Sequence, residues 1–200
     1  MLEQFLYELG KVLPDFEKQG MRPGASDTEI NIIEEALAPL GLTAELRNLY
    51  CWHNGSSTEF FPEVPVFGFR FLSLQDSLET IKMLGTDPFA KDWVKQFLPV
   101  GDIEGTIMLA TLHNLDNNRS QIFQYVIEDG NAYLMHQSIQ AMIQTATFVW
   151  TTQAVQGQSF SDPRLLFSPE AYIETQKGST SRSGIQNVFD FSISLPEHLK

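Results

Sequence analysis

Cysteine is almost absent from the sequence: Cys51 is the single one in 200 residues. A lone cysteine cannot form an internal disulfide, and such sparing use favours a reducing compartment. Long apolar runs are lacking too, because no stretch approaches the roughly 18 consecutive apolar residues of a membrane-spanning helix. The opening segment MLEQFLYELGKVLPDF has no basic n-region and carries Glu3 and Glu8 among its apolar residues, which argues against a secretory signal. We therefore expect a cytoplasmic protein with no membrane partner.

Positive charge is scarce as well. Lys and Arg total 13 against 25 Asp and Glu, for a formal net charge of −12. Phosphate backbones and anionic lipid surfaces recruit Lys and Arg, so this balance argues against nucleic acid as a partner. Two explanations of the acidity remain open: solubility alone, or attraction to a basic protein partner.

The short motifs of common enzyme classes do not occur: G-x-S-x-G, G-x-G-x-x-G, the Walker loop and H-E-x-x-H are all missing. Asp76 and Glu79 lie three apart, and a solvated helix face explains them better than an acid/base pair. Asp102, Glu104 and Asp116 lie in or beside turns, where turn formation is favoured over a weak cation site. We expect no catalytic residue, no cofactor and no metal.

The segment LRNLYCWHNG, residues 46–55, gathers the most reactive side chains of the chain. Cys51 and His53 are two residues apart, so on a helix they point about 200° away from each other and cannot share a proton. A zinc site needs about four ligands. The remaining histidines show no pairing motif: His113, His136 and His198.

We therefore interpret this segment as the end of a helix. Tyr50 or Trp52 packs in the core, and Cys51 is a small buried side chain. Asn54-Gly55 ends the helix, and His53 covers its last carbonyls.

Helical spacing and capping signals predict five helices. Apolar residues at positions 2, 5, 6 and 9 mark the first helix, and the sequence Ser26-Asp27-Thr28-Glu29 reads as the capping box of the second. Thr43 caps the third helix, Ser73 caps the fourth and Gly85 stops it, and Ser138 opens the fifth.

Alternation at residues 66–71 and short apolar segments after it predict the strands. Residues 66–71 alternate as a strand does, and FLPVGD and TIMLATL follow. QIFQYVI and NAYLMH flank Glu128-Asp129-Gly130, a hairpin signal. The predicted fold class is α+β: an antiparallel β-meander sheet packed against N-terminal and C-terminal helices. We expect an N-terminal helix and linker at 1–25, the domain at 26–150, and a polar extension, partly folded back on the domain, at 151–200.

This order of motifs resembles the SUKH superfamily, which includes Smi/Knr-type regulators of cell-wall synthesis and many bacterial immunity proteins. The resemblance covers about residues 26–150, and its motifs are L-T-x-x-L-R-x-L-Y-x-x-H-N-G, FLSLQDSLETI and FLPVGD before a glycine turn. The chain departs from the family at Leu42-Thr43, where Leu-Pro is common, and at Thr106 and Ala110 or Thr111, where the family has Asp. The resemblance implies structural roles for Leu46, Tyr50, Trp52, Asn54, Gly55, Trp93 and Pro99.

The resemblance also implies a non-catalytic protein-binding domain. Bacterial members neutralise toxins by contact, so we expect an immunity protein whose partner is a polymorphic toxin domain, and a basic toxin that acts on nucleic acid suits the net charge. The alternative is a regulatory scaffold in signalling or cell-envelope synthesis. Acids in loops and near strand ends can reach a partner without a burial cost. We expect the contact at Glu59, Glu63, Asp102, Glu104 and Asp116, with Glu34 and Glu35 of the second helix as competitors.

Overall fold

The computed structural model describes residues 2–13, 20–57, 69–91, 93–103, 105–112, 118–128 and 130–156. These residues form, in chain order, α1 (Leu2–Val12), α3 (Asp27–Leu37), α4 (Ala44–Trp52), β1 (Arg70–Phe71), α5 (Leu74–Leu84), the 3₁₀ helix η2 (Val94–Gln96), β2 (Phe97–Ile103), β3 (Thr106–Thr111), β4 (Ile122–Val126), β5 (Asn131–His136) and α6 (Ile139–Gln156).

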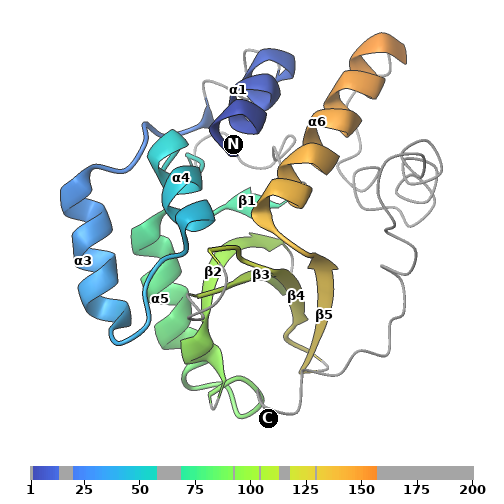
Figure 1. Ribbon diagram of the computed structural model, residues 1–200. Helices are drawn as coiled ribbons and strands as arrows, with labels where there is room; N and C mark the ends of the chain where they lie inside the picture. Colours follow the sequence, from blue (N-terminus) through green and yellow to red (C-terminus); the bar gives the residue numbers. More distant parts are fainter. Residues whose placement is uncertain are drawn as a thin grey trace.

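The strands form one antiparallel sheet in the order β1-β2-β3-β4-β5 (Figure 1). Each strand pairs with the next in the chain, so the sheet is a meander and the predicted α+β class is confirmed. The register of β2 against β3 shifts between Pro99 and Gly101. A side chain at Gly101 would not fit, because a Cβ there would lie 1.9 Å from the Phe69 ring.

Both faces of the sheet are covered. Met108 and Ala110 belong to a buried cluster with apolar residues of α1, α3, α4 and α6. Ile107 and Leu109 belong to a second cluster, with the end of α5, the turn after it and η2. Successive residues of a strand point to opposite faces, so β3 separates two apolar cores, one on each side of the sheet.

The predicted helix caps are present. The Ser26 hydroxyl accepts from the Glu29 backbone N–H at 3.3 Å, and the Glu29 carboxylate accepts from the Ser26 N–H at 2.8 Å. Ser73 caps α5 through a reciprocal box that uses Asp76. Thr43 accepts from the Leu46 N–H at 3.1 Å. Each cap satisfies N–H groups that the first turn of a helix leaves without a partner.

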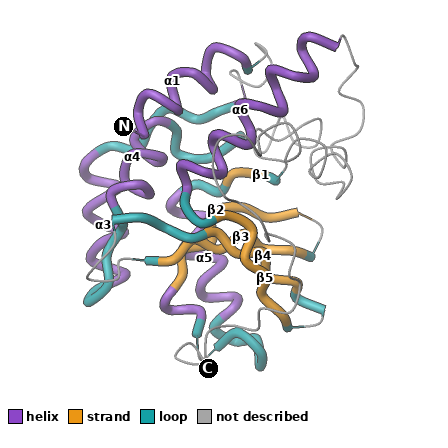
Figure 2. The backbone as a smooth tube through the Cα atoms, turned by 45° about the vertical axis from the view of Figure 1, so that its right-hand side comes forward, coloured by secondary structure: helices purple, strands orange, loops and turns teal. Residues whose placement is uncertain are grey.

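The closing helix, α6, continues through Gln156, past residue 150 where composition places the start of the extension. It packs along α1, whose buried residues are Leu2, Leu6 and Leu9 (Figures 1 and 2). Residues 66–68 of the first predicted strand, and residues 157–200 of the extension, lie outside the described residues. Among the described helices, none combines the length and the apolar character needed to cross a bilayer.

Candidate functional site

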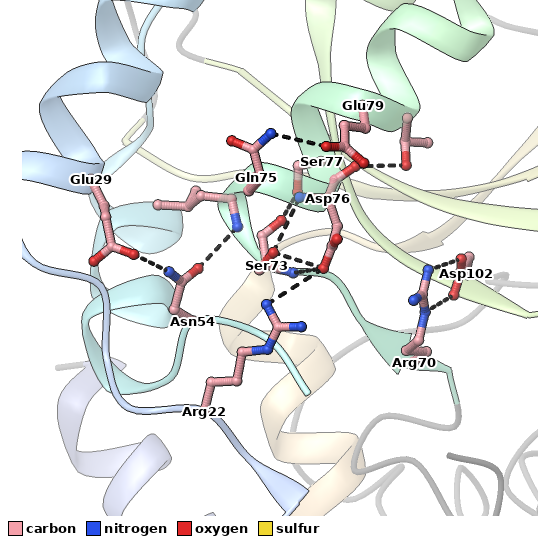
Figure 3. Close-up of polar contacts among 12 residues, drawn as sticks. Arg22, Glu29, Asn54, Arg70, Ser73, Gln75, Asp76, Ser77, Glu79 and Asp102 are labelled. Atoms are coloured by element: carbon pink, nitrogen blue, oxygen red, sulfur yellow. Dashed lines mark hydrogen bonds and ion pairs between the residues drawn. The ribbon is translucent and has the colours of Figure 1, made fainter. Parts of the chain in front are cut away.

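Of the five acids expected at the partner contact, only Asp102 is described; Glu59, Glu63, Glu104 and Asp116 lie outside the described residues. Asp102 of β2 faces Arg70 of β1 in the sheet register. Arg70 donates from Nε to Oδ1 at 2.7 Å and from Nη2 to Oδ2 at 2.5 Å (Figure 3). Such a forked pair is the strong geometry for a guanidinium and a carboxylate. The charge of Asp102 is therefore compensated within the chain.

Asn54 of the HNG sequence lies in a polar cluster at the start of α5. We name this cluster the α5 junction, and its residues are Arg22, Glu29, Asn54, Ser73 and Asp76. Asn54 is its centre (Figure 3). Its Oδ1 accepts from the Leu74 backbone N–H at 2.9 Å, and its Nδ2 donates to Glu29 Oε1 at 3.0 Å. One amide side chain thus links the first turn of α3 to the first turn of α5.

The carboxylates of the α5 junction are fixed by neighbouring donors. Asp76 accepts from the Ser73 hydroxyl at 2.7 Å, and the Arg22 guanidinium lies 3.8 Å from the same carboxylate. A backbone hydrogen bond from Ser26 lowers the pKa of Glu29, and the Ser26 hydroxyl and the Asn54 amide lower this pKa further. Asp76 is therefore a capping residue, and Glu79 accepts a hydrogen bond from Gln75 at 3.0 Å.

The chain before α3 runs along the end of α4. His53 Nδ1 lies 2.6 Å from the carbonyl oxygen of Arg22, and the Arg22 N–H donates to the Gly55 carbonyl at 2.9 Å. Because a carbonyl accepts, the ring nitrogen of His53 is the donor. Burial lowers the pKa of His53, and the bond to Arg22 raises it by less. The side chain of His53 thus covers a carbonyl of a neighbouring segment, whereas its backbone N–H donates to the Leu49 carbonyl in the last turn of α4 at 3.1 Å.

The last turn of α4 corrects two expectations. Cys51 is exposed, not buried, because Leu49 and Tyr50 turn the apolar side of the helix inward and Cys51 points away from it. The helix ends with an extended His53, so Gly55 is not its C-cap. Gly55 has φ 85°, and a Cβ there would lie 2.4 Å from the Ser73 nitrogen.

The other residues of the family motif lie in the two cores. Leu46 and Tyr50 are fully buried, Trp52 is half-buried against the same core, and Pro99 pairs with Leu109 in the sheet. Burial raises the pKa of the Tyr50 phenol, which lies 3.2 Å from the Ser77 hydroxyl.

Trp93 packs in the second buried cluster. Its ring packs edge-on against Phe97 and Tyr125, at centroid distances of 5.5 and 5.0 Å. Its indole N–H donates to the Phe89 carbonyl at 2.7 Å, which satisfies the polar end of a buried ring.

Glu45 is a buried acid that no local pattern predicts. It is 7% exposed, and its Oε2 accepts from the backbone N–H groups of Ser120 at 3.0 Å and Ile139 at 3.1 Å. Thr43 and Ser120 share a hydroxyl hydrogen bond of 2.7 Å beside it. Glu45 therefore connects α4 to the strand region and to the start of α6. Its hydrogen-bond partners are distant in sequence. The sequence around Glu45 therefore shows only an acidic residue in the first turn of a helix.

The described side chains offer little for metal chemistry. No group of three or more His, Cys, Asp or Glu side chains comes together among them. The exposed features of these residues are instead four large apolar side chains: Tyr7, Ile32, Met83 and Phe89.

A comparison of the chain with curated proteins finds no match. The family model described as SMI1 / KNR4 family (SUKH-1) matches residues 24–145. The match begins just before the capping box of α3, contains the α5 junction except Arg22, and includes the five described strands and the start of α6. It covers more than half of the chain, and the chain therefore belongs to the SMI1 / KNR4 family (SUKH-1).

Proposed function

We propose that the chain is a cytoplasmic, non-catalytic protein-binding domain: an immunity protein that neutralises a cognate toxin by direct contact. The family match over residues 24–145 carries this proposal, because immunity by protein contact is the role that the resemblance implies for bacterial members. The positively charged side chains of the described ion pairs do not contradict the proposed function, because each of them is already paired with a carboxylate of the same chain.

Electrostatics support a basic toxin as the partner. The net charge is −12, and the guanidinium groups of Arg22, Arg47 and Arg70 each pair with a carboxylate. An acidic inhibitor attracts a basic nucleic-acid-binding surface and accelerates encounter with it, typically by 10 to 10³-fold. The five acids named from the sequence are proposed to supply part of this field, and pairing with Arg70 reduces the share of Asp102.

Co-expression tests the proposal. The probe is the small basic C-terminal domain of a secreted protein whose coding sequence lies beside that of this chain, expressed from an inducible promoter. We expect growth to stop with the domain alone and to continue when the full chain is co-expressed. A matched control is another acidic protein of similar net charge, which should give no protection. Continued arrest in the presence of the chain would refute toxin neutralisation.

A regulatory scaffold is the second candidate. It is favoured by one observation: α1, and α6 beyond residue 145, lie outside the family match, and α1 packs against α6. A scaffold needs more than one contact surface, and such additions supply one. Binding to envelope-synthesis or signalling proteins, without protection in the co-expression test, would identify this role.

A further inference from the structure

The helix α3 lies at the outer edge of the molecule in both views of the backbone (Figures 1 and 2). Ile30 and Ile33 are its buried residues. The capping box at Ser26 fixes its start, and an ion pair from Glu34 to Arg47 of α4 fixes its second half. The helix is therefore held rigidly while its opposite side faces solvent.

At the centre of that solvent side is Ile32, which is 55% exposed. Residues three and four positions away on a helix are surface neighbours. For Ile32 these neighbours are all exposed, and with it they define the α3 outer face: Thr28, Glu29, Ile32, Glu35 and Ala36. The face has an apolar centre, two small side chains along the axis and two flanking glutamates.

The charge of this helix is of one sign. The sequence of α3 contains Asp27, Glu29, Glu34 and Glu35 and no Lys or Arg. Arg47 compensates Glu34. The carboxylate of Glu29 is held in place by Ser26 and Asn54. The carboxylate of Glu35 is exposed and makes no hydrogen bond or ion pair with the rest of the described chain.

Of the other three exposed apolar side chains, Tyr7 has a basic neighbour. The ammonium group of Lys11 lies 4.2 Å from the ring centre of Tyr7. Met83 lies three residues after Thr80 and four after Glu79, so it has one acidic neighbour on α5. Among the exposed apolar side chains of the described residues, Ile32 is thus the one with a glutamate on each side of it along its helix, Glu29 and Glu35.

We propose that the α3 outer face is the docking surface for a protein partner that presents an apolar pocket bordered by Lys and Arg side chains. Ile32 fills the pocket, and Glu29 and Glu35 face the basic border. The inference rests on the proposed function and adds to it the place of contact. An apolar anchor enclosed by polar groups that exclude water is the usual arrangement of an energetic centre in an interface. The loop acids act at long range and accelerate encounter, whereas the α3 outer face determines how long the complex lasts.

The test measures dissociation constants by calorimetry for the full chain and an inactive variant of the basic toxin domain described above. Ile32→Lys removes the anchor and places a cation in the basic pocket. We expect it to weaken binding by at least about 30-fold, the effect of a strong interface centre, mainly through faster dissociation. Glu35→Lys should weaken binding by about 10-fold. Met83→Lys is the matched control, because Met83 has a similar exposure of 50% on another helix, and it should bind as wild type does.

Carboxyl labelling adds a second readout that does not depend on a substitution. Complex formation should protect Glu35 from labelling and leave Glu3 of α1 reactive. Circular dichroism should show unchanged folding of each variant, since all three positions are exposed. If wild type binds and Ile32→Lys and Glu35→Lys bind equally well, the α3 surface is wrong and the proposed function stands. If wild type fails to bind the toxin domain, the proposed function is refuted and this inference with it.

Discussion

At the scale of single residues, the most informative side chains are those that satisfy backbone donors from distant parts of the chain. Asn54 accepts from Leu74 and donates to Glu29, and Glu45 accepts from Ser120 and Ile139. A buried N–H without a partner costs free energy comparable to a lost hydrogen bond. These two side chains therefore determine how the helices meet, although neither belongs to the apolar core.

Replacing Glu45 tests this role. Glu45→Ala leaves two buried N–H groups without an acceptor, so we expect a loss of about 3 kcal/mol in the free energy of unfolding. Glu45→Gln keeps an acceptor oxygen and should lose less. Urea denaturation measures both. Glu35→Ala, at an exposed helix position, is the control and should change stability by no more than about 0.5 kcal/mol. An equally small loss in Glu45→Ala would mean that water replaces the carboxylate.

The pKa of His53 makes a prediction about pH. Burial holds this pKa below that of an unfolded histidine, so between the two values the unfolded chain binds more protons than the folded one. The free energy of unfolding should therefore fall as the pH is lowered through about 6.5. Denaturant titrations at pH 7.5 and pH 5.5 measure the loss, and it should be smaller in His53→Gln. An NMR titration that gives His53 an ordinary or raised pKa would contradict the sign.

At the scale of elements, the two kinds of glycine in the chain have opposite roles. Gly10 lies inside α1, and a Cβ there would meet nothing within 4 Å. Gly55 has φ 85° and almost touches the backbone of Ser73. Gly10 lowers the helix propensity of α1. Gly55, in contrast, is required because its φ is positive and because its backbone lies so close to Ser73 that a side chain would not fit.

Alanine at each position should separate these roles. Gly10→Ala should raise the free energy of unfolding by about 0.5 to 1 kcal/mol. Gly55→Ala should lower it by about 2 kcal/mol or more, because a positive φ is strained for alanine and the Cβ clashes with the start of α5. Thermal unfolding followed by circular dichroism measures both. A neutral Gly55→Ala would show that the junction between α4 and α5 relaxes freely.

At the scale of the whole molecule, the net charge of −12 predicts steered association. The association rate with the toxin domain should fall steeply as salt is raised, because the screening length shortens from about 8 Å at physiological strength to about 3 Å at 1 M. A variant with Gln or Asn at all five loop acids should associate more slowly and depend less on salt: Glu59, Glu63, Asp102, Glu104 and Asp116. Stopped-flow mixing across a salt series measures this. A salt-independent wild-type rate would remove the electrostatic support for a basic partner.

Much of the fold was predictable because its signals are local. The serine and threonine caps, the apolar segments of β2 to β5 and the hairpin glycine at Gly130 involve residues within one turn or one strand pair. The antiparallel meander follows, since short connections leave sequential strands adjacent. The candidate surface was less predictable. Asp102 reads as a free turn acid, and only the pairing of β1 with β2 brings Arg70 to it across 32 residues.

The amino-acid sequence by itself determined the capped helices, the meander sheet and the family, because periodicity and capping act between near neighbours. Only the tertiary structure decided which polar groups remain for a partner. In the sequence, Glu45, Asp102 and Glu35 all look like surface acids, yet folding buries the first, pairs the second and leaves the third in water. The physical reason is that a charge loses hydration or gains a partner only when distant segments pack against it. The exposed centre of α3 arises in the same way, because the packing of Ile30 and Ile33 decides which side of that helix Ile32 must occupy.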